Sequence, residues 1–163
     1  MAQLIIGLGS GRSGSTSLAR FFSEQPDSFF CHEGAYDRPR FLRYTFGHSL
    51  SWDIDDAEFE KWLAGLTRAA GDAKYFGDCA LYLLPYTERI LAARPEARFI
   101  CIKRERAATV RSLLRANAGV NPWQKSPAGK QNRWERIFPK FEGVSREEAA
   151  IRYWDLYYSI AEE

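Results

Sequence analysis

A glycine-rich loop that directly follows an apolar run constrains the fold of this chain more than any other feature. The sequence reads GLGSGRSGSTSL over residues 7–18, immediately after the apolar residues 4–6. The apolar run predicts a short buried strand over 3–8, and the residues behind the loop predict a helix over 15–24. A strand, a glycine loop and a helix in this order predict an α/β fold with a ligand site at the loop.

The composition of the loop indicates that its ligand is an anion. Three glycines within six residues let the backbone approach a bound group, and a helix N-terminus points its free N–H groups at negative charge. Four hydroxyl side chains add donors: Ser13, Ser15, Thr16 and Ser17. A glycine-rich turn that binds nothing would leave these hydroxyl groups and Arg12 without a purpose.

The rest of the chain alternates predicted strands with predicted helices. Strands are predicted over 28–31, 75–77 and 98–103, and helices over 56–70, 86–93, 107–117 and 145–163. Asp55 or Asp56 can cap the helix at 56–70, and Ser145 with Glu148 forms a capping box. The alternation predicts an α/β fold, a three-layer parallel sheet with helices on both faces. The 163 residues fit a single domain in which 118–144 is a long irregular segment.

Two of the predicted helices carry an apolar stripe at helical spacing. The stripe of the helix at 56–70 consists of Phe59, Leu63, Leu66 and Ala70, and that of the last helix of Ile151, Trp154, Tyr158 and Ala161. Both stripes are predicted to face the core.

Composition restricts the classes of partner. The net charge is only +2, so an anion site depends on local basic groups, and general nucleic-acid binding is not expected. The three cysteines lie far apart and the two histidines lack zinc-ligand spacing, which favours a reduced, cytoplasmic protein without a metal site. No apolar stretch approaches the ~20 residues of a membrane span, and no signal peptide precedes the first strand.

A nucleoside triphosphate is the first anion to consider, because residues 9–14 have the glycine spacing of a P-loop. In the pattern G-x-x-x-x-G-K-[ST], a lysine follows the second glycine and neutralises the β- and γ-phosphates, whereas Ser15 follows it here. P-loop enzymes also hold magnesium with an aspartate after another apolar strand. The strand FICIK is followed by Arg104 instead. A P-loop kinase with an aberrant loop stays as an alternative.

A second basic element begins at Arg104. Ser112 follows eight positions later, two turns into the predicted helix, where the two side chains can converge on one phosphate. For this element alone, pairing of Arg104 with Glu88 or Glu105 is the alternative. Together with the loop, the element resembles the sulfotransferases that use 3′-phosphoadenosine 5′-phosphosulfate (PAPS). Their phosphosulfate loop, [KR]-S-G-[ST]-[ST], is matched by residues 12–16, and their 3′-phosphate element by Arg104 and Ser112.

This resemblance implies a function and a set of binding residues. The protein would transfer a sulfuryl group from PAPS to a hydroxyl of a carbohydrate or other small molecule, without a metal ion, and release 3′,5′-adenosine bisphosphate. Arg12 would stabilise charge on the leaving phosphate as a catalytic residue. The residues assigned to PAPS are Arg12, Ser13, Gly14, Ser15, Thr16, Ser17, Arg104 and Ser112. A nucleotide- or polyanion-binding module without catalysis is the alternative outside the enzymes.

The acceptor hydroxyl must lose a proton as it attacks sulfur, so a base is expected across from the loop. By the resemblance, Glu33 in the stretch FFCHEG is this base, and His32 is the alternative because other branches of the family use histidine. Neighbouring residues of an extended backbone point to opposite sides, so only one of the two is expected to face the site. Two surface residues without a role are the remaining interpretation.

A third segment of the family often carries lysine or serine near the sulfate. Asp78 and Cys79 stand in that segment here, so no sulfate contact is expected from it. Asp78 is interpreted as a residue that orients the acceptor or a basic neighbour. Cys79 is interpreted as a small buried residue, since the sequence pairs no histidine with it.

The irregular segment interleaves aromatic and basic residues. They are Trp123, Lys125, Lys130, Arg133, Trp134, Arg136, Phe138, Lys140 and Phe141. A lid that stacks on a sugar or attracts an anionic acceptor, a single-stranded nucleic-acid surface, and aromatic residues that merely pack the segment down are all open. Sulfotransferase domains usually continue beyond this length, so the resemblance implies that their C-terminal part is absent. Nothing in the sequence predicts an oligomeric state.

Overall fold

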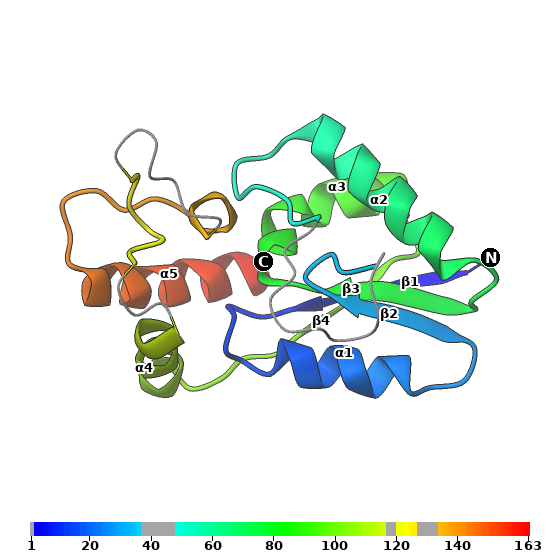
Figure 1. Ribbon diagram of the computed structural model, residues 1–163, viewed down its shortest axis with the longest axis horizontal. Helices are drawn as coiled ribbons and strands as arrows, with labels where there is room; N and C mark the ends of the chain where they lie inside the picture. The colour runs from blue at the N-terminus through cyan, green and yellow to red at the C-terminus, as the bar shows by residue number, and fades with distance from the viewer. Residues whose placement is uncertain (1, 37–47, 117–119, 127–133) are drawn as a thin grey trace.

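The protein is built on a parallel β-sheet (Figure 1). The computed structural model describes residues 2–36, 48–116, 120–126 and 134–163. Within these ranges four strands pair in the order β2-β3-β1-β4, all parallel. They are β1 (Gln3–Leu8), β2 (Ser28–His32), β3 (Tyr75–Cys79) and β4 (Arg98–Cys101). The predicted α/β class with a parallel sheet is confirmed.

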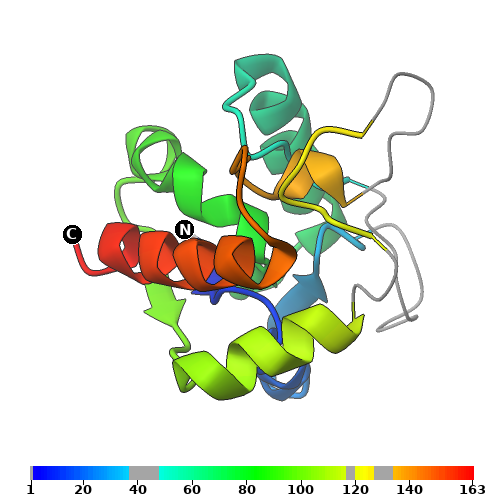
Figure 2. The same cartoon turned by 90° about the vertical axis from the view of Figure 1, so that its left-hand side faces the viewer.

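Helices lie on both faces of this sheet. The helices are α1 (Ser15–Ser23), α2 (Asp56–Ala70), η1 (Leu81–Tyr86), α3 (Thr87–Ala93), α4 (Arg106–Ala116), η2 (Glu135–Ile137) and α5 (Arg146–Ala161). Figure 1 shows α1 on one face of the sheet and α2 and α3 on the other. The last two long helices, α4 and α5, pack side by side at the end of the sheet where β1 ends (Figures 1 and 2).

Three strands end at different residues from those predicted, and β2 is one residue longer, ending at His32. β3 continues to Cys79, because Asp78 and Cys79 pair with Ile6 and Gly7 of β1. β4 ends at Cys101 rather than at Lys103, because its partner strand β1 ends at Leu8 and the glycine loop begins there. The difference at β3 matters for the site, since it places Asp78 inside the sheet.

The predicted helix caps are present. Asp55 caps α2 by accepting a hydrogen bond from the Glu58 N–H over 3.0 Å, and Ser145 caps α5 by accepting from the Glu148 N–H over 3.1 Å. On α2, Phe59, Leu63 and Leu66 are buried as predicted, and Trp62 is buried with them. Their cluster includes Leu4, Ile6 and Leu8 on one face of β1.

The buried face of α5 is rotated from the predicted stripe. Tyr158 is buried, but Ile151, Trp154 and Ala161 are only half-buried. The fully buried side chains of this helix are Ala149, Ala150, Tyr153 and Tyr157. The face of α5 with Tyr153 and Tyr157 is buried because the rings of Trp123 and Phe138 contact Tyr153. The Tyr157 hydroxyl also accepts a hydrogen bond from the glycine loop.

The irregular segment over 118–144 is described only in part, at 120–126 and 134–144. Trp123 and Phe138 are buried and contact each other edge to face, with ring centroids 5.4 Å apart. Arg136 pairs with Glu58, and the Lys140 ammonium donates to the backbone oxygen of Pro122 over 2.7 Å. Arg136 and the two aromatic rings, which also contact Tyr153, therefore join the segment to the body of the protein, whereas Lys140 bonds within the segment. Lys130 and Arg133 of the predicted basic set lie outside the described residues.

Candidate functional site

The glycine loop between β1 and α1 has an irregular backbone, and the N–H groups of its second half have no acceptor among the described residues. Gly11, Arg12 and Gly14 have positive φ angles of 76°, 56° and 114°. The first intrahelical hydrogen bond runs from the Leu18 N–H to the Gly14 oxygen over 3.0 Å. Among the described residues, none accepts a hydrogen bond from the backbone N–H groups of Ser13 to Ser17. These donors at a helix N-terminus form a cradle suited to an anion.

Two tyrosines of α5 anchor the start of this loop. The Gly9 N–H donates to the Tyr157 hydroxyl over 2.9 Å, and the Ser10 N–H donates to the Tyr158 hydroxyl over 3.4 Å. The Tyr158 hydroxyl in turn donates to the backbone oxygen of Ile102 over 2.7 Å. This anchoring could not be predicted from the sequence, because 148 positions separate the partners and no local pattern marks them.

The two predicted anion-binding elements lie next to each other. Arg12 donates from Nε to the Ser112 hydroxyl over 3.2 Å, and Arg104 donates from Nη1 to the backbone oxygen of Arg12 over 2.9 Å. Ser112 is buried on α4, whereas Arg104 is exposed. The Glu105 carboxylate accepts hydrogen bonds from the N–H groups of Ala107 and Ala108 at the start of α4. Ser112 is thus hydrogen-bonded to Arg12, and the Arg104 guanidinium lies against the loop backbone.

The two candidate bases lie at the end of β2, where His32 is the last residue of the strand and Glu33 begins a tight turn. Glu33 and Gly34 both have positive φ angles, 54° and 72°. Because Glu33 is left-handed rather than extended, the expected alternation of side chains is broken: His32 reaches Ser15 and Thr16, and the Glu33 carboxyl lies 3.9 Å from the His32 ring. Nε2 of the His32 ring contacts the loop, whereas Nδ1 faces the Glu33 carboxyl, so the expectation that only one of the two side chains faces the loop stays a prediction. Their side chains are 18% and 17% exposed.

His32 contacts the hydroxyl groups at the start of α1. Its Nε2 lies 3.0 Å from the Ser15 hydroxyl and 3.3 Å from the Thr16 hydroxyl. Burial lowers the pKa of His32 from 6.5 to about 4, so the ring is neutral at physiological pH. A neutral ring in this place orients the two hydroxyl groups of the loop.

Glu33 is held in an environment that favours its protonated form. The pKa of Glu33 is raised from 4.5 to about 8: burial is the largest cause, the negative charge of Asp78 adds to the rise, and the Arg12 guanidinium opposes both. A carboxyl whose pKa lies near the working pH suits a group that takes up a proton and later releases it. The hydrogen bond from the Glu33 N–H to the backbone oxygen of Cys79, over 3.4 Å, places Glu33 beside the end of β3.

Asp78 is fully buried at the end of β3. Its Oδ2 accepts hydrogen bonds from the Gly34 N–H over 2.9 Å, from Trp62 Nε1 over 3.3 Å and from the Tyr82 hydroxyl over 3.4 Å. Burial raises the pKa of Asp78, and these donors oppose the rise. Cys79 is buried as predicted, and burial raises the pKa of its thiol.

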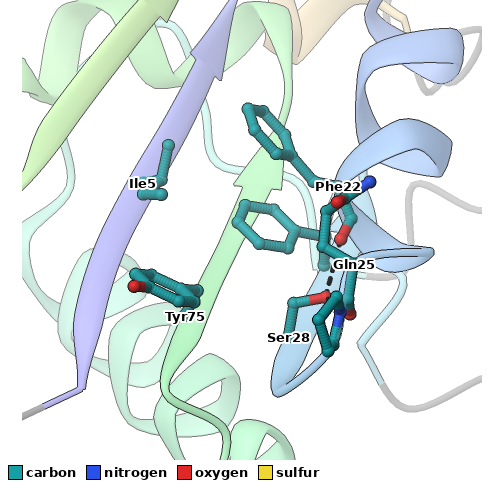
Figure 3. Close-up of a pocket in the computed structure, with 7 residues that line it drawn as sticks. Ile5, Phe22, Gln25, Ser28 and Tyr75 are labelled. Atoms are coloured by element: carbon teal, nitrogen blue, oxygen red, sulfur yellow. Dashed lines mark hydrogen bonds between the residues drawn. The ribbon is translucent and has the colours of Figure 1, made fainter.

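A separate cavity lies between α1 and the sheet. It has a volume of about 310 Å³, and its lining is mainly apolar, with Ile5, Phe22 and Tyr75 among the residues around it (Figure 3). None of the residues assigned to PAPS lines this cavity. The apolar cavity is therefore not part of the candidate anion site.

The described residues also offer neither a cluster of metal ligands nor a helix that could span a membrane. Over 2–36, 48–116, 120–126 and 134–163, no group of three or more His, Cys, Asp or Glu residues is gathered in a way that could hold a metal ion. None of the helices in these ranges is long and apolar enough to cross a membrane. No protein-family model and no curated protein matches the sequence.

Proposed function

We propose that the protein transfers a sulfuryl group from PAPS to the hydroxyl group of a carbohydrate or other small molecule. The observation that carries this proposal is the convergence of Arg12, Arg104 and Ser112 beside a loop of free N–H groups. A donor with phosphate groups at both its 5′ and 3′ positions needs two neighbouring anion sites. The two sequence elements that resemble those of PAPS-dependent sulfotransferases are adjacent in the fold.

The loop residues fit the 5′-phosphosulfate of such a donor. The N–H groups of Ser13 to Ser17 have no acceptor among the described residues, and the buried Ser13 hydroxyl also has no hydrogen-bond partner there. An anion in the loop would satisfy these donors. Arg12 would stabilise the charge that develops on the leaving phosphate, and Arg104 with Ser112 would bind the 3′-phosphate.

The proposed reaction is a direct displacement at sulfur. The acceptor oxygen forms a bond to sulfur while the bond between sulfur and the 5′-phosphate oxygen breaks. The acceptor proton passes to the carboxylate of Glu33, and the products are a sulfate ester and 3′,5′-adenosine bisphosphate. Glu33 must be ionised for this step, so activity is expected to rise with pH as Glu33 loses its proton. His32 keeps the hydroxyl groups of Ser15 and Thr16 in place.

Thermal unfolding with nucleotides tests the proposal. The midpoint is measured with 3′,5′-adenosine bisphosphate, with adenosine 5′-monophosphate and with magnesium-ATP, each at the same concentration. A ligand at a hundred times its dissociation constant adds about 2.7 kcal/mol of stability, which raises the midpoint by several degrees. We expect a shift with the bisphosphate that clearly exceeds the other two.

The other outcomes distinguish the alternatives. A shift with magnesium-ATP alone would replace the proposal with a P-loop kinase. If the bisphosphate shifts the midpoint and the loss of Glu33 changes neither nucleotide binding nor any activity, the protein would be a binding module without catalysis. The absence of any shift would overturn the proposed donor.

A further inference from the structure

We propose that Asp78 acts on Glu33 as a positioning residue: it holds the turn that presents the Glu33 carboxyl, and its negative charge sets the pH range in which that carboxyl can accept a proton. This inference rests on the proposed function for its purpose, because it concerns the residue proposed as the base. Its geometry, however, is independent of the reaction.

The end of β3 holds the turn after β2 at two consecutive residues. The Glu33 N–H donates to the backbone oxygen of Cys79 over 3.4 Å, and the Gly34 N–H donates to Asp78 Oδ2 over 2.9 Å. Asp78 pairs with Cys31 in the sheet, so its backbone is fixed next to the strand that leads into the turn. The Asp78 carboxyl therefore takes the place of a backbone acceptor for a turn that leaves the sheet.

This support is needed because the turn is conformationally unfavourable. Glu33 has a Cβ atom and a φ of 54°, a left-handed conformation that such residues seldom adopt. Residues in this conformation persist where the surrounding structure determines them, and they concentrate at functional sites. Here the determining contacts come from Asp78 and Cys79, and the Glu33 carboxyl in this turn lies 3.9 Å from Nδ1 of the His32 ring.

When the carboxyl of Asp78 is ionised, its hydrogen-bond partners do not neutralise its charge. It is fully buried, its Oδ2 accepts from three neutral donors, and its Oδ1 has no hydrogen-bond partner among the described residues. None of those donors is a cation, so they cannot cancel a negative charge. Burial also reduces screening by water and salt, so that the charge acts strongly on its neighbours.

Several ionisable groups surround the pair of carboxyls. Glu33 interacts with Arg12 of the loop, His32 of β2, Asp78 of β3, Tyr82 of η1 and Tyr153 of α5. Asp78 additionally faces Cys31, Cys79 and the indole of Trp62. Arg12 is the cation among these partners of Glu33, and it opposes the effect of Asp78 on the Glu33 pKa. Burial is the largest cause of the raised pKa of Glu33, and Asp78 and Arg12 modify that pKa in opposite directions.

Carbon-13 NMR of the side-chain carboxyls tests this inference in the ligand-free protein. Glu33 is titrated in the wild type, in Asp78→Asn and in Tyr82→Phe. Asp78→Asn keeps an acceptor oxygen for Gly34 but removes the charge, so we expect the Glu33 midpoint to fall by about one pH unit or more. Tyr82→Phe removes one donor from Asp78 but keeps the charge, so we expect the midpoint to stay or to rise.

The wild type also provides a test that needs no variant. Asp78 must lose its proton at a lower pH than Glu33, since a neutral Asp78 cannot raise the midpoint of its neighbour. A higher midpoint for Asp78 than for Glu33 would overturn the inference. An unchanged Glu33 midpoint in Asp78→Asn would overturn it as well.

Activity then separates this inference from the proposed function. If sulfuryl transfer occurs, the acidic limb of the pH–rate profile should shift to lower pH in Asp78→Asn, whereas a purely structural role would lower the rate equally at every pH. If the NMR midpoint shifts but no donor nucleotide binds, the proposed function fails and the coupling between Asp78 and Glu33 stands.

Discussion

Arg12 donates a hydrogen bond from Nε to the hydroxyl of Ser112, over 3.2 Å, across a hundred positions of sequence. The bond joins the loop after β1 to the middle of α4. Arg104, two residues before α4, donates a hydrogen bond to the backbone oxygen of Arg12. The two anion-binding elements are thus mechanically connected, and a ligand at one is expected to influence the other.

Arg104→Ala tests the assignment of the 3′-phosphate. We expect it to weaken the binding of 3′,5′-adenosine bisphosphate at least tenfold, because a charge-assisted hydrogen bond contributes about 1.5–3 kcal/mol. Binding of adenosine 5′-monophosphate should weaken much less. Isothermal titration calorimetry measures both. Arg106→Ala is the matched control, since Arg106 forms an exposed ion pair with Asp155. Equal losses for the two nucleotides would remove Arg104 from the 3′-phosphate site.

Glu33→Gln tests the assignment of the base. The amide keeps the size of the side chain but cannot accept the proton, so turnover should fall by about 10²-fold or more. Affinity for the bisphosphate should stay nearly unchanged, as nucleotide-dependent thermal shifts would show. A variant with full turnover would exclude Glu33 as the base and direct attention to His32.

The pH dependence of stability should carry opposite contributions from the same two residues. Because the pKa of Glu33 is raised from 4.5 to about 8, the folded state holds a proton that the unfolded state has lost, and this contribution to stability falls as pH rises through that window. The pKa of His32 is lowered from 6.5 to about 4, so its contribution rises with pH within its own window.

Of these two residues, only Glu33 makes a contribution to the free energy of unfolding that still changes with pH above pH 6.5. Glu33→Gln should therefore gain up to ~2 kcal/mol relative to the wild type between about pH 6.5 and 8, at about 1.4 kcal/mol per unit of pKa. Urea unfolding at a series of pH values measures the difference. A constant difference across this range would contradict the raised pKa.

Gly34→Ala and Gly143→Ala form a matched pair with the same φ of +72°. A Cβ at Gly34 would lie 2.9 Å from the His48 carbonyl group and from the Tyr82 hydroxyl, whereas a Cβ at Gly143 would meet nothing within 4 Å. Gly143→Ala should cost about 1–2 kcal/mol from the left-handed backbone alone. We expect Gly34→Ala to cost about 1–3 kcal/mol more in chemical denaturation, because neighbouring atoms must move. Similar costs would mean that the turn is less tightly enclosed.

Tyr157→Phe and Tyr153→Phe each remove one buried hydroxyl from α5. The Tyr157 hydroxyl accepts from the Gly9 N–H, and its loss should cost about 1–3 kcal/mol because that N–H would be left without a partner. The Tyr153 hydroxyl has no hydrogen-bond partner among the described residues, so its loss should be close to neutral. Unfolding free energies compare the two variants, and equal costs would contradict the anchoring of the loop.

Local signals in the sequence predicted the framework but not the arrangement of the bases. The strand, the glycine loop and the caps at Asp55 and Ser145 were predictable because each depends on a few adjacent residues. The left-handed conformation of Glu33 was not, because nothing in its local sequence demands it. It follows from contacts with Asp78 and Cys79, more than forty positions away, which local patterns do not reveal.

The hydrogen bonds from Gly9 and Ser10 to the tyrosines of α5 have a consequence for synthesis on the ribosome. The partners of the loop at 157 and 158 are translated 148 residues after the loop itself. Until those tyrosines emerge, the nascent loop lacks the acceptors that fix its backbone. The anion cradle therefore acquires its final form only after α5 has been translated, and contacts of such large sequence separation are slow to form.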